Sequence, residues 1–353
     1  MGDGTKENPY TREDVLRMIE ENGGKAQGLD LSGKIFEEGI DLSGHDLRRI
    51  ILARAKLREA HLEGANLRYA HLEGAVLSRA HLEETDLRRV QAQKVKMSDA
   101  QLREANLGHA NLEGATLRRA NLVEAHLRRI HLERANLIDS QLERADLRNA
   151  RLDEAHLQRA QLQEANLTRA CLEGANLHET EFSPHTKLVR VYWGNYVIGE
   201  ERKQQFLWAS DIYRGLKTWH TSVGMYNIAA EFYYREMEAK RKAQSWKRKP
   251  HLKLWNWFVR LLCGYGEKPE RVVISAAVVV LGLALIYFTI GTLTPHTFLD
   301  SLYYSAVSFI ALGYGQWAPQ PAGWVKGLGV FEAFIGVFMM ALFLVTFTRK
   351  MTR

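Results

Sequence analysis

The sequence "ANLRYAHLEGAVLSRAHLEE", residues 65–84, repeats a five-residue unit, Ala-x-Leu-x-x. The same unit governs much of the chain. Every fifth position from Leu42 to Phe182 is apolar, and each one is Leu except Ala92, Met97 and Phe182 itself. A period of five matches neither an α-helix, with about 3.6 residues per turn, nor a strand, in which side chains alternate. Neither element could therefore bury this row of leucines on one face.

This pattern resembles the pentapeptide-repeat family, whose unit is A-(D/N)-L-x-x, over residues 28–182. The resemblance implies a right-handed, four-sided (quadrilateral) β-helix with Leu and Ala stacked inside. Because stacked strands lie about 4.8 Å apart, about seven coils would make a rod on the order of 35 Å long. An open β-helix exposes strand edges at its ends. We expect residues 1–27 to form an N-terminal capping helix, with Thr11 and Asp14 at capping-box spacing and Gly23 ending the helix.

In this register, residues 20 apart should lie one above another. One such row alternates in sign, and opposite charges on neighbouring strands contribute about 0.2–1 kcal/mol per pair. It comprises Glu59, Arg79, Asp99, Arg119, Asp139, Arg159 and Glu179. A second row is nearly all acidic, and we interpret it as a solvated face rather than a docking strip for a cytosolic protein partner. It comprises Glu73, Gln93, Glu113, Glu133, Asp153 and Glu173.

Histidine replaces the usual Asp or Asn at several repeat positions. These positions are His61, His71, His81, His126, His131 and His156. Only His61 and His81 are neighbours in the 20-residue register, so we expect no three- or four-ligand metal site here. We interpret these histidines as polar surface residues.

The net charge of +7 hides a division along the chain. Residues 28–182 carry 23 Lys and Arg against 25 Asp and Glu, whereas residues 183–353 carry 21 against 10. A nearly neutral repeat argues against the DNA mimicry that strongly acidic pentapeptide rods perform. Cys171 and Cys263 lie far apart, so no disulfide framework is expected. No nucleophile–base set or phosphate loop stands out, so we expect no enzyme, no catalytic residues and no cofactor.

Residues 183–250 are expected to form a helical connector, with two helices around a turn at Ser222–Tyr226. A basic run, "KRKAQSWKRKP", ends this segment at residues 240–250. Such a run can bind nucleic acid, but the membrane segments that follow favour a topology anchor and no nucleic-acid partner. Residues 251–270 predict an amphipathic helix at the membrane interface, with Trp255 and Trp257 as anchors.

Two segments are long and apolar enough to cross a lipid bilayer. Residues Val272–Gly291 carry no charge, and Gly327–Thr348 are interrupted only by Glu332. Eleven Lys and Arg residues lie in Arg235–Arg271, and none lies in Thr292–Val325. The positive-inside rule therefore predicts a multi-pass protein of the plasma or inner membrane with both termini in the cytoplasm.

Between these spans, Thr297 and Asp300 open a short predicted helix over residues 298–309. At 1.5 Å per residue it is about 18 Å long, too short to span the membrane. Glycine-rich backbone follows it, and such backbone is tolerated at membrane depth only inside protein or beside a wet cavity. A re-entrant segment satisfies both conditions.

Residues 271–353 thus resemble the two-transmembrane potassium-channel module: outer helix, pore helix, selectivity filter and inner helix. The family filter reads T-V-G-Y-G-D. The matching residues here are Ala311, Leu312, Gly313, Tyr314, Gly315 and Gln316. The resemblance implies that the carbonyl groups of Ala311, Leu312, Gly313 and Tyr314 coordinate K⁺. Ala311 lacks the hydroxyl of the family's Thr, and Gln316 lacks the charge of its Asp, so the preference for K⁺ over Na⁺ stays open.

Three further features belong to this module. Glu332 either lines the conduction path or forms a hydrogen bond behind the pore helix, and we favour the second. Gly336 either bends the inner helix for gating or allows close helix packing. A second Gly-Tyr-Gly, residues 264–266, precedes the first span without a pore helix, and we expect it to form a bend.

A ring of filter carbonyls requires four copies of a chain with one filter. The sequence therefore predicts a homotetrameric cation channel, K⁺ being its permeant ion, with a cytosolic repeat domain for regulation or partner docking. The alternative is a membrane-anchored repeat scaffold that binds a protein partner and does not conduct.

Overall fold

The computed structural model describes residues 2–244, 250–290, 293–294, 297–311, 320–321 and 323–351. It divides into two compact units, Met1–Gly215 and Leu216–Arg353. Each unit is considered by itself below.

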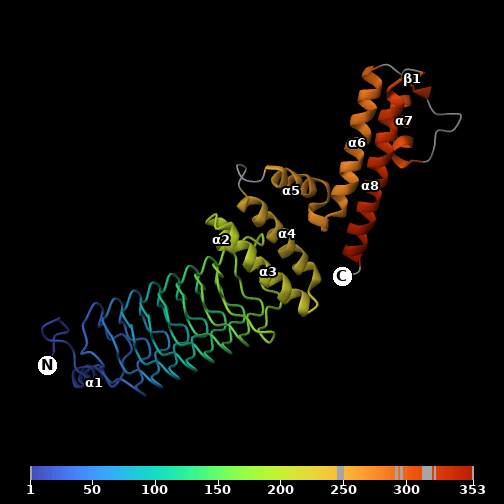
Figure 1. Cartoon of the computed structure of the whole chain (residues 1–353). Coiled ribbons are helices and arrows are strands. Elements are labelled where there is room, and N and C mark those ends of the chain that lie inside the picture. Colours follow the sequence, from blue (N-terminus) through green and yellow to red (C-terminus); the bar gives the residue numbers. More distant parts are fainter. Residues whose placement is uncertain are drawn as a thin grey trace. The chain divides into compact units, whose positions relative to one another are not determined.

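The first unit is a column of stacked coils (Figure 1). Isolated parallel bridges join residues 20 apart, such as His61 with His81 and Thr116 with Asn136. Each bridge is framed by two backbone hydrogen bonds: Leu62 N donates to His81 O over 2.8 Å, and His81 N donates to Ala60 O over 2.9 Å. Each coil therefore takes four pentapeptides, as the resemblance to the pentapeptide-repeat family implied.

The corners of the coils place residues in the left-handed region of φ. The position two residues after each Leu has a φ near 60°, for example 60° at Arg79 and 63° at Gly64. Only some of these positions are Gly, although a side chain with a Cβ makes this conformation less favourable. The ladder of backbone hydrogen bonds therefore imposes the corner on arginines and glutamates as well.

Leucine and alanine fill the inside of the column. Leu117 is 1% exposed and Ala115 is fully buried, and their equivalents in the other coils are buried alike. Three hydroxyls enter the alanine row, at Thr85, Ser140 and Thr180, and each donates to a backbone carbonyl. Thr85 Oγ1 donates to Leu62 O, and Ser140 Oγ donates to Leu137 O, both over 2.7 Å. The polar exceptions thus leave no donor unsatisfied.

Helix α1, Arg12–Glu21, covers the first coils. Its capping box is formed as predicted, because Thr11 and Asp14 bond each other's backbone N–H groups. At the other end the ladder continues past Phe182 with a one-residue insertion, from Asn166 to Lys187 and from Cys171 to Tyr192. The short helix α2, Gly199–Arg202, then buries Glu200, which accepts a hydrogen bond from His178 N over 2.9 Å.

Two helices form the predicted hairpin of the connector: α3, Phe206–Ser222, and α4, Tyr226–Ala243. Helix α5, Pro250–Cys263, corresponds to the predicted interfacial segment. A 3-10 helix, η1, Gly264–Gly266, links α5 to α6.

The remaining helices of the second unit are α6, Pro269–Ile290, α7, Phe298–Ile310, and α8, Val325–Met351. Helix α7 packs against both α6 and α8 (Figure 1). Two short strands, β1, Leu293–Thr294, and β2, Gln320–Pro321, pair antiparallel. Pro269–Ile290 and Val325–Thr348 are both long and apolar enough to cross a membrane.

Candidate functional site

Helix α7 begins and ends as the sequence predicted. Thr297 caps it, accepting a hydrogen bond from Asp300 N over 3.1 Å. It ends at Ala311, which is exposed and has a φ of 55° and a ψ of 30°, the left-handed conformation that commonly closes helices. The other five residues of the predicted filter, Leu312 to Gln316, lie outside the described residues.

Glu332 of α8 is fully buried and joins the three helices of this module. The hydroxyl of Tyr287 in α6 donates a hydrogen bond to Glu332 Oε2 over 2.9 Å. Ser305 of α7 contacts Glu332 Oε1, and its Oγ also lies 2.8 Å from the carbonyl oxygen of Val280 in α6. A carboxylate in an apolar setting is stable only with such partners. Of the two interpretations left open above, these contacts support a bonding role behind α7.

An aromatic pair surrounds this carboxylate. The rings of Tyr287 and Tyr304 meet edge to face, with centroids 5.0 Å apart and planes at 89°. Both rings are buried, in a cluster that also contains Leu293 and Val325. The start of α7 is thus packed between the ends of α6 and α8.

The end of α7 lies against α8 at Gly336. A Cβ added at Gly336 would overlap the carbonyl oxygen of Phe309. Helix α8 continues through this position without a break. Only a glycine allows so close an approach of the two backbones, so close packing accounts for Gly336.

The outer faces of α6 and α8 carry large apolar side chains on the surface. Ile274 and Val278 of α6 are 62% and 63% exposed, and Phe334 of α8 is 72% exposed. An apolar surface of this extent in water would favour aggregation, and it suits contact with lipid or with other subunits. These helices therefore have the surface of a membrane protein.

The second Gly-Tyr-Gly does form a bend, but its tyrosine has a role that the sequence did not suggest. Tyr265 is buried with a φ of 60°, and its hydroxyl donates to Glu238 Oε1 of α4 over 3.0 Å. Glu238 also pairs with Arg241 at 3.0 Å and with Arg260 of α5 at 2.9 Å. The bend is therefore fastened to the connector hairpin. Nothing in the local pattern points to a contact across 27 residues.

The charges in this cluster shift each other's titration. Burial alone would raise the pKa of Glu238, but hydrogen bonds from Arg241 and Tyr265 and the charge of Arg260 outweigh it, so its pKa lies below the ordinary value. Burial and the Glu238 carboxylate raise the pKa of Tyr265. The tyrosine thus remains a hydrogen-bond donor and Glu238 remains charged at neutral pH.

Both predicted interfacial anchors lie on the surface of α5. Trp255 is 59% exposed and Trp257 is 50% exposed, whereas Leu262 on the same helix is buried. Because residues two apart do not share a helix face, the two tryptophans are exposed on different sides of α5.

The row of alternating charges on the repeat forms ion pairs between coils, as predicted. Arg79 pairs with Glu59 at 3.1 Å, and Arg119 and Arg159 pair with the aspartates one coil earlier at 2.7 and 2.6 Å. The acidic row is also partly neutralised by its own chain. Glu133, for instance, lies 2.8 Å from Arg151.

The expectation that the histidines form no three-ligand group needs correction. The ligand atoms of His61, His81 and Glu63 lie within 4.8 Å of one another, with the two imidazole rings stacked 4.6 Å apart. The stacking register alone omits Glu63, which stands two residues along the same coil and lies 2.8 Å from His61 Nδ1. All three side chains are partly exposed.

Two family models match the chain. Pentapeptide repeats match in eight copies, over residues 38–68, 55–90, 96–134, 118–153 and 140–178. A model described as ion channel matches residues 273–353. Members of both families are in general not enzymes. No curated protein sequence matches the chain.

Three solved structures illustrate the likeness, and two of them, HetL and Rfr23, are described as pentapeptide-repeat proteins. QnrB1, a plasmid-mediated fluoroquinolone resistance protein, is 16% identical, with a TM-score of 0.42, over 48% of this chain and 93% of its own. HetL from the cyanobacterium Nostoc sp. strain PCC 7120, involved in heterocyst differentiation regulation, is 29% identical, with a TM-score of 0.31, over 52% and 94%. Rfr23 from the cyanobacterium Cyanothece 51142 is 22% identical, with a TM-score of 0.19, over 52% and 99%. Likenesses this low say nothing about function.

The family models and the two apolar helices agree with the organisation described above. The chain is a membrane protein that joins pentapeptide repeats to an ion-channel domain of the potassium-channel-like kind.

Proposed function

We propose that four copies of this chain form a cation channel that conducts K⁺, with Ala311, Leu312, Gly313, Tyr314, Gly315 and Gln316 as its selectivity filter. In this proposal α6 is the outer helix, α7 the re-entrant pore helix and α8 the inner helix. The carbonyl groups of residues 311–314 replace the hydration shell of the permeant ion. No other cofactor is required.

The observation that carries the proposal is the buried Glu332, which bonds Tyr287 of α6 and Ser305 of α7. These bonds, with the contact of Gly336 at Phe309, hold a helix too short to span the membrane between two helices that are long enough. A fixed α7 keeps its negative C-terminal end in one position, where it would stabilise a cation. Such a support suits a filter, whose carbonyl oxygens must stay in position while ions pass.

The rest of the chain fits a cytosolic regulator attached to this pore. Residues 28–182 would form the cytosolic repeat domain, residues 183–250 the connector, and residues 251–270 the interfacial segment with Trp255 and Trp257 at the lipid headgroups. Both termini would then lie in the cytoplasm, below the plasma or inner membrane. A cytosolic protein partner would dock on the repeat domain.

The test is ion flux from liposomes that contain the purified protein. We expect K⁺ efflux from wild-type vesicles and none from Gly313→Ala, because a Cβ disfavours the backbone torsions that a filter carbonyl needs. The mass in detergent should be four times the 40.4 kDa of one chain. A tetramer without flux would indicate the alternative, a non-conducting scaffold, and a monomer would exclude any pore.

A further inference from the structure

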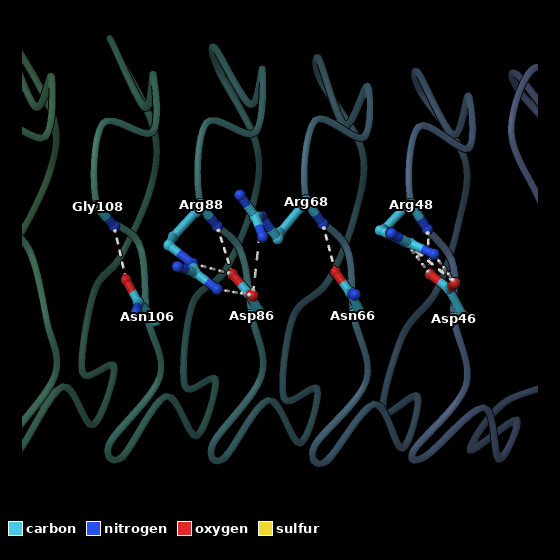
Figure 2. A network of polar contacts seen from close by, with 8 residues as sticks. All are labelled: Asp46, Arg48, Asn66, Arg68, Asp86, Arg88, Asn106 and Gly108. Carbon is cyan, nitrogen blue, oxygen red and sulfur yellow. Dashed lines mark hydrogen bonds and ion pairs between the residues drawn. The ribbon is translucent and has the colours of Figure 1, made fainter.

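One edge of the repeat column is lined by arginines. Arg48, Arg68 and Arg88 occupy the same corner position in successive coils, where Figure 2 shows their side chains along one edge. The next residue at this corner is Arg49, Tyr69 and Arg89 in turn. The near-neutral total charge of the repeat concealed this concentration of positive charge.

A cavity of about 450 Å³ opens at the N-terminal end of this edge. The segment after α1 forms one wall with Lys25, and the first coils form the other with Arg48, Arg49, Arg68 and Tyr69. Asp46 is the one carboxylate in its lining, against four cationic side chains. The volume falls within the range of pockets for small ligands, about 300–1,000 Å³, but the lining is cationic instead of apolar.

The positive charge in this cavity is only partly neutralised. Asp46 forms an ion pair with Arg48 at 2.6 Å, and this pair neutralises one of the four cations. Arg68 is 3.9 Å from Asp86, which is itself 2.5 Å from Arg88. Within the described part of the chain, no carboxylate lies within 4.0 Å of Lys25 or Arg49.

The arginines of the opposite corner behave differently. Arg79, Arg119 and Arg159 each pair with a carboxylate one coil away, at 3.1, 2.7 and 2.6 Å. Around the cavity a tyrosine stands between the arginines instead. The guanidinium groups of Arg49 and Arg68 lie 5.6 and 5.7 Å from the centroid of the Tyr69 ring. The ring stabilises each cation by a cation–π contact but leaves its charge in place.

We propose that this cavity binds a phosphate group. Several guanidinium groups around one space repel each other, and an anion between them relieves that repulsion. Guanidinium groups bind phosphate through paired, charge-assisted hydrogen bonds, and they do so better than lysines because their donors are fixed in a plane. The ligand is therefore a phosphorylated small molecule or a phosphate-bearing lipid headgroup, bound on the repeat domain.

The chain offers a matched control for the test. Arg128 and Arg129 stand at the same corner four coils from Arg48 and Arg49. Arg128 lies 3.9 Å from Asp146, as Arg68 lies 3.9 Å from Asp86, and Arg129 has a φ of 57° against 56° at Arg49. Neither residue lines the cavity. The pocket variant is thus Arg49→Gln with Arg68→Gln, and the control is Arg128→Gln with Arg129→Gln.

Binding is measured by calorimetry on the purified full chain in detergent, at constant ionic strength, since salt screens nonspecific attraction. One arm titrates pyrophosphate and the other titrates short-chain phosphatidic acid, with short-chain phosphatidylcholine as its blank. We expect saturable binding in at least one arm, about tenfold or more weaker in the pocket variant and within about twofold of wild type in the control. The arm that responds identifies a soluble or a lipid source.

The proposal is overturned if the folded wild type binds neither probe. It is equally overturned if both variants lose affinity alike, because the binding would then be diffuse attraction along the arginine edge. Far-UV circular dichroism of both variants shows whether the repeat remains folded. The affinities of the two variants are then compared per folded protein. The assay measures phosphate directly, so its result does not depend on whether the pore conducts.

Discussion

Removing the Glu332 carboxyl should loosen the contact of α7 with both neighbouring helices. The change Glu332→Ala takes away the acceptor of the Tyr287 hydroxyl and the partner of Ser305. Glu332→Gln keeps the size of the side chain and one oxygen acceptor. Glu332→Ala therefore removes both hydrogen bonds, whereas Glu332→Gln replaces only one of the two oxygen atoms.

The magnitude follows from these two contacts. A hydrogen bond to a buried carboxyl group contributes about 1–3 kcal/mol, so the pair contributes about 2–6 kcal/mol before compensation. Deleting the carboxyl also removes its own desolvation cost, which offsets part of this loss. We expect Glu332→Ala to destabilise the second unit by about 2–4 kcal/mol and Glu332→Gln by about 1 kcal/mol.

Cys263 provides the readout, because it is buried in the core of the second unit. In a Cys171→Ser background, a thiol-reactive dye in detergent reports unfolding of this unit alone. Glu270→Ala is the control, since Glu270 is exposed and lies 3.8 Å from Lys350. The melting temperature should fall most for Glu332→Ala, less for Glu332→Gln and hardly for Glu270→Ala. Equal melting of Glu332→Ala and Glu270→Ala would refute the bonding role of Glu332.

Further substitutions test other parts of the structure. Gly336→Ala should lower the stability of the second unit by about 1–3 kcal/mol in the same dye assay, because the added methyl group meets the Phe309 carbonyl. Gly327→Ala is its control, because Gly327 has open space around it and the substitution should not destabilise α8. In the repeat, Leu117→Ala should lower the free energy of unfolding in urea by about 2–5 kcal/mol, because Leu117 is buried. Arg119→Ala removes only an exposed ion pair and should lower it by less than about 1 kcal/mol. Equal losses would contradict the assignment of Leu117 to the core. Burial lowers the pKa of His220 below its ordinary value of 6.5, so at acidic pH the unfolded chain binds a proton at this residue more readily than the folded chain does. The contribution of His220 to stability should therefore be complete above pH 6.5 and decline as the pH falls below 6.5. His220→Gln should flatten this decline between pH 7 and 5, and an unchanged slope would contradict the role of His220 in it.

The sequence predicted the repeat column well because its period is a direct consequence of the coil. Each Leu and Ala position corresponds to a buried side chain, and the 20-residue register correctly paired Arg119 with Asp99. The left-handed corners were not predicted, since Arg and Glu have no preference for positive φ. There the ladder overrides the local preference of the residue.

The contacts that the sequence did not reveal join residues from separate elements. Glu238 and Tyr265 meet because α4 packs near the bend, and no periodic pattern records that contact. Glu332 was recognised because a carboxyl stands out in an apolar segment, but its partners Tyr287 and Ser305 look like ordinary helix residues. The cationic cavity likewise depends on how the segment after α1 approaches the first coils.

The reversal potential of single channels in a planar bilayer tests most directly whether this protein forms a potassium pore. With K⁺ tenfold higher on one side and Na⁺ making up the difference on the other, a K⁺-selective pore reverses near the K⁺ equilibrium potential, about 59 mV from zero. We expect a reversal potential shifted toward this value, and a larger shift in Ala311→Thr, which restores the family's hydroxyl. A tetrameric protein that passes no current, or currents that reverse at zero in both proteins, would contradict this expectation.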